Sequence, residues 1–256
     1  MSVVTHFVSP EWYKTPEGRD VVSSLMHLNS QTRRSFGLLE KPVPPSQYTL
    51  EEYPYKVFVS GKSGVGKTST VAKLTGNDIP ATHSETPGIQ TAITYWPAKI
   101  MNINKLVMFR IQFWDAGENA LKKFDHILPA CKSQMDGVLF LFSFIDKTSF
   151  DDLPHQMSRI LDVEDNVCKF VMGTKLDLYS QGEVTQRDIQ QFESHWNVPL
   201  FSIRNQSTAS RSSPRPDLDE VAPVLNYICD ELWTRDQILS GRISQKDLMP
   251  HRISYC

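Results

Sequence analysis

Residues 61–68 read Gly-Lys-Ser-Gly-Val-Gly-Lys-Thr, directly after an apolar run that reads Tyr-Lys-Val-Phe-Val at 55–59. The eight residues match the pattern Gly-x-x-x-x-Gly-Lys-Ser/Thr, in which a strand ends, a glycine-rich turn follows and a helix begins. Such a turn points successive backbone N–H groups and the positive end of the helix at one place, where they surround a phosphate group. A chance glycine-rich turn is the alternative, and the preceding strand and following helix weigh against it.

Two side chains of this loop have chemical roles of their own. Lys67 is expected to reach the β- and γ-phosphates of a nucleotide, and Thr68 to offer its hydroxyl to Mg²⁺. With their neighbours, the predicted phosphate-binding residues are Ser63, Gly64, Val65, Gly66, Lys67, Thr68 and Ser69.

A second motif concerns the base. An apolar strand at 167–172 is followed by Gly-Thr-Lys-Leu-Asp at 173–177. A carboxylate at a strand end can accept hydrogen bonds from the N1–H and exocyclic amine of guanine, a donor pair that adenine lacks. Asp177 is therefore predicted to read guanine, Lys175 to lie along the base, and Thr174 to tie this loop to the phosphate loop. An ordinary charged loop is the alternative, but the position at the carboxyl end of a strand favours a ligand site.

Two segments between these motifs are expected to supply further ligands to Mg²⁺ and the γ-phosphate. Thr86 lies in a polar stretch, 77–88, without periodicity. It can give Mg²⁺ a second hydroxyl and the γ-phosphate a backbone N–H, although a surface-loop threonine is the alternative. Asp115 ends a strand and is expected to hold Mg²⁺ through water, while the N–H of Gly117 meets the γ-phosphate. The predicted metal site therefore consists of Thr68, Thr86 and Asp115.

These motifs resemble those of the Ras superfamily of small GTPases, over about residues 53–237. Ser63 before Gly64, and the segment 144–153, are similar to the Rab branch, whereas 173–178 is closer to the Rho branch. This mixture, with a shortened Trp-Asp-Ala-Gly-Glu segment and a long N-terminal arm, is similar to the Rem- and Rab-like GTPases of the ciliogenesis and planar polarity effector complex. The resemblance implies an α/β fold, a P-loop GTPase domain with helices on both faces of a six-stranded mixed sheet, mostly parallel with one antiparallel edge strand.

The resemblance also implies GTP and GDP as ligands, Mg²⁺ as cofactor, and a switch whose output is GTP-dependent partner binding. The implied partners are the longin-type proteins fuzzy and inturned at the ciliary basal body, in vesicle delivery, exocytosis and cilium assembly. Two alternatives stay open: a structural subunit that holds GTP permanently, and a P-loop small-molecule kinase. The Thr-Lys-Leu-Asp motif opposes the kinase, as does the lack of an Arg-rich lid.

The catalytic position departs from the family pattern. The third motif is Asp-x-x-Gly followed by a Gln that orients the attacking water, yet here one residue separates Asp115 from Gly117, and Glu118 stands where Gln is expected. An ionised Glu only accepts hydrogen bonds and brings negative charge toward the γ-phosphate. Glu118 therefore predicts slow intrinsic hydrolysis, which favours the permanently GTP-bound alternative. The fifth motif aligns with residues 204–206 but is not recognisable, so no base contact is predicted there.

The 256 residues suffice for one α/β domain with two extensions. The predicted division is an N-terminal arm (1–52), the GTPase domain (53–237) and a tail (238–256). Pro16 is expected to start a short helix in the arm, followed by a stiff proline-rich linker at 40–45. The apolar stripe of that helix, expected to dock on the domain or on a partner, is Val21, Val22, Leu25, Met26 and Leu28.

The strand and helix pattern of the domain follows from its apolar periodicity. Strands are predicted at 55–60, 89–100, 104–114, 137–144, 167–173 and 199–203, and helices at 67–75, 118–129, 149–162, 185–195 and 218–234. Residues 204–217 are polar and rich in helix breakers, which predicts a mobile insert.

Charge and cysteine content indicate a cytoplasmic protein. The net charge of −2 gives no electrostatic case for nucleic acid or an anionic membrane. The four cysteines, Cys131, Cys168, Cys229 and Cys256, are scattered, as suits a reducing compartment. The longest apolar run, 137–145, is too short to span a membrane, and neither a signal peptide nor a lipidation motif is recognised. Membrane recruitment is therefore expected only through partners.

Overall fold

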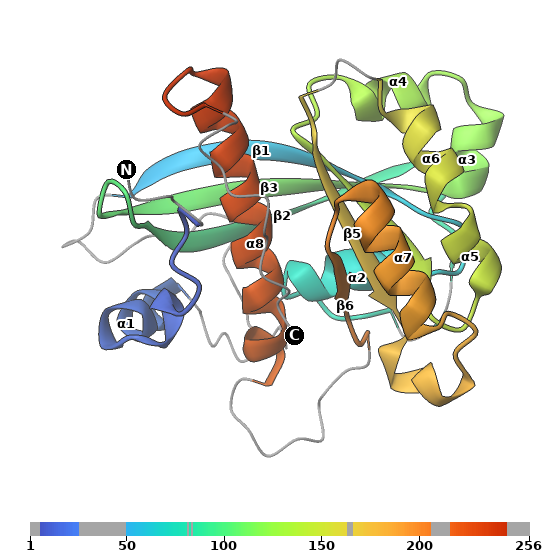
Figure 1. Cartoon of the computed structure of the whole chain (residues 1–256), viewed down its shortest axis with the longest axis horizontal. Helices are drawn as coiled ribbons and strands as arrows, with labels where there is room; N and C mark the ends of the chain where they lie inside the picture. Colours follow the sequence, from blue (N-terminus) through green and yellow to red (C-terminus); the bar gives the residue numbers. More distant parts are fainter. Residues whose placement is uncertain are drawn as a thin grey trace.

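The computed structural model of the chain describes residues 6–25, 50–80, 82, 84–162, 166–205 and 216–244. A six-stranded sheet with the order β2-β3-β1-β4-β5-β6 forms its centre (Figure 1). Neighbouring strands pair in parallel except β2, which runs antiparallel to β3 at one edge. This confirms the predicted mixed sheet. The strands are β1 (Glu51–Ser60), β2 (Ile89–Ile100), β3 (Lys105–Ala116), β4 (Gly137–Ser143), β5 (Cys168–Thr174) and β6 (Leu200–Ser202).

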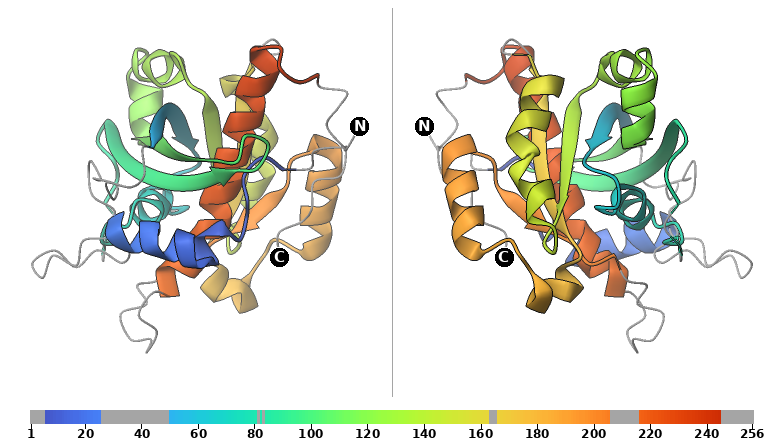
Figure 2. Two further views of the ribbon diagram at one scale, coloured as in Figure 1. Left: turned by 90° about the vertical axis from the view of Figure 1, so that its left-hand side faces the viewer. Right: turned by 90° about the vertical axis from the view of Figure 1, so that its right-hand side faces the viewer.

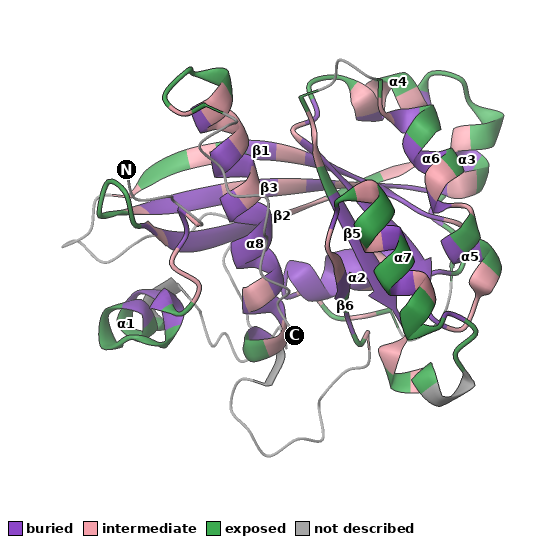
Figure 3. Ribbon diagram, in the orientation of Figure 1, coloured by how far each residue is buried: buried purple, intermediate pink, exposed green. Residues whose placement is uncertain are grey.

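Helices cover both faces of the sheet (Figure 2). One face carries α2 (Lys67–Leu74) and α8 (Pro216–Leu239), and the other carries α3 (Glu118–Lys123), α4 (Ile127–Lys132), α5 (Lys147–Asp151), α6 (Leu153–Ile160) and α7 (Gln186–Trp196). Strand β4 is buried along its whole length because both of its faces are covered. Its neighbour β5 is likewise mostly buried, as the purple colour shows in Figure 3. In β1 the side chains alternate, with Val57 and Val59 in one core and Phe58 in the other.

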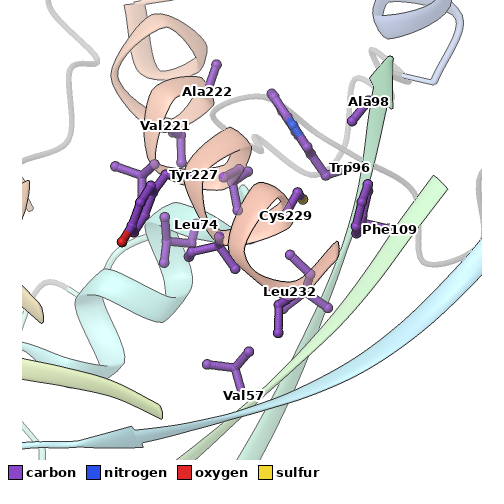
Figure 4. Packing of buried hydrophobic residues seen from close by; sticks show 14 of the residues in the cluster. Val57, Leu74, Trp96, Ala98, Phe109, Val221, Ala222, Tyr227, Cys229 and Leu232 are labelled. Carbon is purple, nitrogen blue, oxygen red and sulfur yellow. The ribbon is translucent and has the colours of Figure 1, made fainter. Parts of the chain in front are cut away.

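The long helix α8 fills the core on its side of the sheet. Figure 4 shows Val221, Tyr227 and Leu232 of α8 near Leu74 of α2 and Trp96 of β2. Each large apolar side chain buried here contributes about 1.5–3 kcal/mol relative to exposure. The core therefore fixes α2, and with it the start of that helix at the phosphate loop.

The N-terminal arm packs on the same molecule. A 3₁₀ turn (Trp12–Lys14) precedes α1 (Pro16–Leu25), which begins at the predicted proline, and Val21 and Val22 lie in the core shared with α8. Backbone pairing joins the arm to the end of β2, because the N–H of Met101 donates to the carbonyl of Phe7 at 2.8 Å. The stripe is thus docked in cis at Val21 and Val22, whereas the side chain of Leu25, Met26, Leu28 and the linker at 40–45 lie outside the described part of the chain.

Two of the predicted helices are wrong because each is broken by a proline. The predicted helix 118–129 is α3 and α4, and the predicted helix 149–162 is α5 and α6. Pro129 and Pro154 lie in the first turns of α4 and α6. In a continuous helix each ring would clash with the carbonyl four residues earlier, which favours a break at these two positions, whereas α8 continues through Pro223.

Other boundaries differ by a few residues. β1 begins at Glu51 rather than at 55, because its first residues extend the pairing with β3. They have no partner on the β4 side, so Pro54, which has no N–H to donate, is tolerated there. The last helix reaches Leu239 instead of 234. Residues 206–215 of the predicted insert, and the tail from 245 on, lie outside the described residues. Within the described part of the chain, no helix combines the length and apolar character needed to cross a membrane.

Candidate nucleotide-binding site

The phosphate loop connects the carboxyl end of β1 to the first turn of α2, as predicted. Gly66 caps α2 in a left-handed conformation with φ 99°, which residues with a side chain rarely adopt. A Cβ at this position would also lie 3.2 Å from Nδ2 of Asn205. Glycine is therefore needed at Gly66 both for the turn and for the close approach of the neighbouring loop.

Lys67 is buried under the loop that it follows. Its ammonium donates to the carbonyls of Gly61 at 2.8 Å and Lys62 at 2.9 Å. Burial lowers the pKa of Lys67, against the opposing charges of Asp115 and Glu118. An anionic ligand at the loop would favour the charged form of this lysine, as the predicted phosphate contact requires.

The predicted metal ligands meet at one point. The hydroxyl of Thr68 donates to Oδ2 of Asp115 at 2.5 Å and lies 3.2 Å from the hydroxyl of Thr86. These residues come from α2, from the segment before β2 and from the end of β3. The other carboxylate oxygen, Oδ1 of Asp115, is buried without a hydrogen-bond partner among the described residues. A buried, unpaired carboxylate oxygen beside two hydroxyls suits Mg²⁺, which takes oxygen ligands, so the residues fit the implied cation.

The segments around Thr86 and Gly117 are joined to each other. The N–H of Gly117 donates to the carbonyl of Gly88 at 3.1 Å, and Asn119 donates to Glu85 through its side chain at 2.7 Å. A Cβ on Gly117 would lie 2.0 Å from the Thr86 carbonyl, so only glycine fits there. The N–H predicted to meet a γ-phosphate thus has a protein partner in this conformation.

Glu118, the residue at the predicted catalytic position, contacts the phosphate loop itself. Its Oε2 accepts a hydrogen bond from the backbone N–H of Ser63 at 2.5 Å, and its Oε1 accepts one from Lys122 at 2.6 Å. Burial raises the pKa of Glu118, but the hydrogen bonds from Lys122 and Ser63 outweigh it and lower the pKa overall. The side chain is therefore an anion at neutral pH, and it occupies a backbone N–H of the phosphate loop.

The predicted base motif lies at the other end of the phosphate loop. The hydroxyl of Thr174 donates to the carbonyl of Val65, which is the contact predicted between the two loops, and to that of Phe142 at 3.0 Å. Lys175 follows in a left-handed conformation with φ 57° and precedes a 3₁₀ turn (Leu176–Gln181) that carries Asp177. Asp177 is exposed there, outside the cleft formed by the phosphate loop.

Most of the remaining predicted residues line one cleft, whereas Val65 and Asp115 are buried and do not belong to its lining. The cleft is bordered by the phosphate loop, by the segment before β2 and by the start of α3. Among the predicted residues its lining includes Ser63, Gly64, Gly66, Lys67, Thr68, Ser69, Thr86, Gly117 and Glu118.

Two residues near the site had no role in the sequence prediction. Asn205, after β6, donates to the Thr70 hydroxyl at 2.9 Å, and its own Oδ1 is buried without a described partner. Its position after a strand end is a signal, but its residue type matches no familiar motif. Lys73 of α2 is buried, pairs with Glu220 of α8 and donates to the Arg204 carbonyl. No motif indicates that contact, which joins α2 to α8.

Comparison with known proteins gives the family. A model of the Ras family matches residues 56–211. The chain is 48% identical over 246 residues to Ciliogenesis and planar polarity effector 2 of Xenopus laevis, covering 94% of this chain and 98% of that protein. It is 44% identical over 239 residues to the protein of the same name from Homo sapiens, covering 91% and 92%.

A more distant relative is Ras-related protein RabF1 of Dictyostelium discoideum, 30% identical over 154 residues, which are 59% of this chain and 75% of that protein. The family match spans the phosphate loop, the metal-site residues and the base motif described above. The chain therefore belongs to the Ras family, and within it to the group that includes the ciliogenesis and planar polarity effector 2 proteins.

Proposed function

We propose that the protein is a GTP-dependent molecular switch that binds guanine nucleotide with Mg²⁺ and acts by binding partner proteins. One observation carries the proposal: Thr68, Thr86 and Asp115 converge beside the phosphate loop, and Oδ1 of Asp115 is buried without a described partner. A buried carboxylate oxygen without a partner costs free energy that a divalent cation recovers.

The residues of the cleft have distinct roles in this proposal. Bound Mg²⁺ supplies positive charge that offsets the charge of the phosphates. Lys67 exchanges the carbonyls of Gly61 and Lys62 for phosphate oxygens, and the backbone N–H groups of the loop donate to the same phosphates. Asp177 and Lys175 select guanine at the other end of the loop. Order in the segments around Thr86 and Gly117 then depends on the terminal phosphate.

Competition between nucleotides tests this function. Labelled GTP is titrated with the full chain in Mg²⁺, and unlabelled ATP or GTP is added in excess. We expect GTP to displace the label and ATP to leave it bound, with affinity lost when Mg²⁺ is chelated. Equal displacement by ATP would contradict guanine recognition.

A permanently GTP-bound structural subunit is the second candidate. The observation that favours it is Glu118, an anion at the catalytic position, because a carboxylate only accepts hydrogen bonds and cannot orient the attacking water as Gln does. The two candidates differ in turnover, so the rate of phosphate release in a single turnover separates them.

The biological setting is proposed from the relatives. Two of them carry the name ciliogenesis and planar polarity effector 2, which supports a role in cilium assembly and planar polarity. We extend this to complex formation with fuzzy and inturned at the basal body, in vesicle delivery and exocytosis. Contact with membranes is then made by the partners, and nucleic acid has no part in it.

A further inference from the structure

The phosphate loop holds an anion supplied by the protein itself. The contact between Oε2 of Glu118 and the Ser63 N–H spans 55 residues of sequence and is charge-assisted, a stronger kind of hydrogen bond than a neutral one. The second oxygen accepts a hydrogen bond at 2.6 Å from the ammonium of Lys122, a residue one helical turn further along α3. The carboxylate is therefore held at the loop from both sides.

Neighbouring residues of the phosphate loop contact different parts of the protein. Val65 and Gly66 lie beside the base motif, through Thr174 and Asn205. Ser63, two residues before Val65, instead contacts Glu118, which begins α3 directly after Gly117. A nucleotide with its base near Thr174 therefore extends its phosphates toward Ser63, and the phosphate farthest from the base comes nearest to the Glu118 carboxylate.

From this arrangement we propose that Glu118 is a specificity-determining residue that discriminates between nucleoside diphosphate and triphosphate. A diphosphate binds with the contact between Glu118 and Ser63 intact. A triphosphate has to replace the carboxylate on the Ser63 N–H and move it away, because two anions cannot share that donor. The inference rests on the proposed guanine-nucleotide function. It adds a free-energy cost to triphosphate binding that diphosphate binding does not have.

This displacement also links the terminal phosphate to α3. Glu118 is the first residue of that helix, and Lys122 holds it from the next turn. Releasing the carboxylate from Ser63 therefore frees the start of α3 to move. The arrangement converts the presence of one phosphate into a change at the surface next to the cleft.

Binding measurements on matched variants test the proposal. The full chain is titrated with fluorescent GDP and with a fluorescent non-hydrolysable GTP analogue, both in Mg²⁺. Glu118→Ala removes the carboxylate. Glu118→Asp keeps the charge but is one methylene shorter, so it does not reach the Ser63 N–H. Glu51→Gln changes the same charge at an exposed position at the opposite end of β1 and serves as the control.

We expect Glu118→Ala and Glu118→Asp to bind the analogue about tenfold more tightly, with GDP affinity unchanged within about twofold. Glu51→Gln should match the wild type for both ligands. An unchanged ratio of analogue affinity to GDP affinity in both Glu118 variants would overturn the inference. Tighter analogue binding by Glu118→Ala but not by Glu118→Asp would also overturn it, because it would show that charge repulsion acts without the contact to Ser63. If the wild type bound neither nucleotide, the proposed function itself would fail.

Discussion

Asp115 links the stability of the fold to the proposed metal site. Its side chain is 2% exposed, and burial raises its pKa despite the hydrogen bond from Thr68 and the charge of Lys67. A raised carboxyl pKa means that the folded protein binds the proton more tightly than the unfolded chain does. The contribution to stability is therefore present at low pH and is lost as the pH rises through the pKa of the folded state. Above that pKa the buried, ionised carboxylate costs stability, and a cation bound at the proposed metal site would offset this cost.

The first prediction follows from this cost. Asp115→Asn should stabilise the metal-free protein by about 1 kcal/mol at neutral pH, because it removes a buried charge. The same change should remove most of the gain in Tm that the wild type shows with Mg²⁺ and GDP. Thermal unfolding with a chelator, and again with both ligands, measures the two effects. A variant that still gained the full ligand-dependent Tm would show that Asp115 is not a metal ligand.

Asp177 gives the second prediction, which concerns the base. Asp177→Asn replaces an acceptor with an amide that can also donate, and xanthine offers an acceptor where guanine offers its amine. We expect GTP affinity to fall by at least about tenfold and xanthosine triphosphate affinity to rise, in line with loss of a charge-assisted pair. Asp151→Asn, on exposed Asp151 of α5, is the matched control and should leave both affinities unchanged. Unaltered base preference in Asp177→Asn would remove this residue from the base site.

The residues of the site differ in how far the sequence could predict them. The approach of Thr68, Thr86 and Asp115 follows from their positions at the ends of strands and the start of a helix, which the motifs specify. The contact of Glu118 with Ser63 does not, because it depends on the short loop that places α3 against the phosphate loop. Lys73 was missed for a similar reason, since long-range packing brings its ammonium to the Arg204 carbonyl. Asn205 follows a strand end, but its residue type matches no familiar motif.

At the scale of elements, the N-terminal arm is joined to the domain through α8. The carboxylate of Asp230 accepts hydrogen bonds from the N–H groups of Phe7 at 2.7 Å and Val8 at 2.8 Å, and it is 6% exposed. Asn226 of the same helix accepts from Trp96 at 2.8 Å and donates to the Pro10 carbonyl at 2.9 Å. One helix therefore positions the arm, the edge strand and, through Lys73, the helix that follows the phosphate loop.

The third prediction tests this docking. Asp230→Ala leaves two buried backbone N–H groups without their acceptor, so we expect a loss of about 2 kcal/mol in the free energy of unfolding. Hydrogen exchange should rise in residues 7–22 more than in the central strands. Glu11→Ala, which alters an exposed charge within the arm, is the control. Equal exchange in the arm of wild type and Asp230→Ala would contradict the role of this carboxylate.

The elements also mark where sequence patterns are insufficient. Apolar periodicity predicted all six strands. It predicted one helix in place of α3 and α4, and one in place of α5 and α6, because the apolar positions continue across each break. Pro129 and Pro154 indicated the two breaks, but the prediction followed the helical pattern of apolar residues instead. The starting point of β1 was missed because pairing with β3 alone extends a strand whose first residues are charged.

At the scale of the whole molecule, the slow step is expected to be hydrolysis. With Glu118 in place of the water-orienting Gln and a loop one residue short, the fourth prediction is intrinsic turnover at or below the ~10⁻⁴ s⁻¹ of an unassisted Ras-type site. Single-turnover release of phosphate measures it, with Glu118→Gln as the comparison. Faster release by the isolated protein would mean that another residue positions the water, and would favour a cycling switch over a permanent subunit.

The fifth prediction concerns assembly. Thr68→Asn disturbs the hydroxyl beside Asp115 and should lower affinity for GTP more than for GDP, so that partner binding is lost. Co-purification with fuzzy and inturned, each compared with wild type in GTP analogue and in GDP, measures the effect. Retention of both partners by Thr68→Asn would show that nucleotide state does not control the complex.

The central claim is that the cleft between the phosphate loop, Thr86 and Glu118 holds a guanine nucleotide with Mg²⁺. Its most direct test is to purify the full chain in Mg²⁺, denature it and identify the released nucleotide by chromatography, with the metal measured in the same sample. The account predicts GTP or GDP near one per protein chain, accompanied by magnesium, and loss of both in Lys67→Ala. An adenine nucleotide, or a folded protein that contains no nucleotide and takes up none when GTP and Mg²⁺ are added, would contradict it.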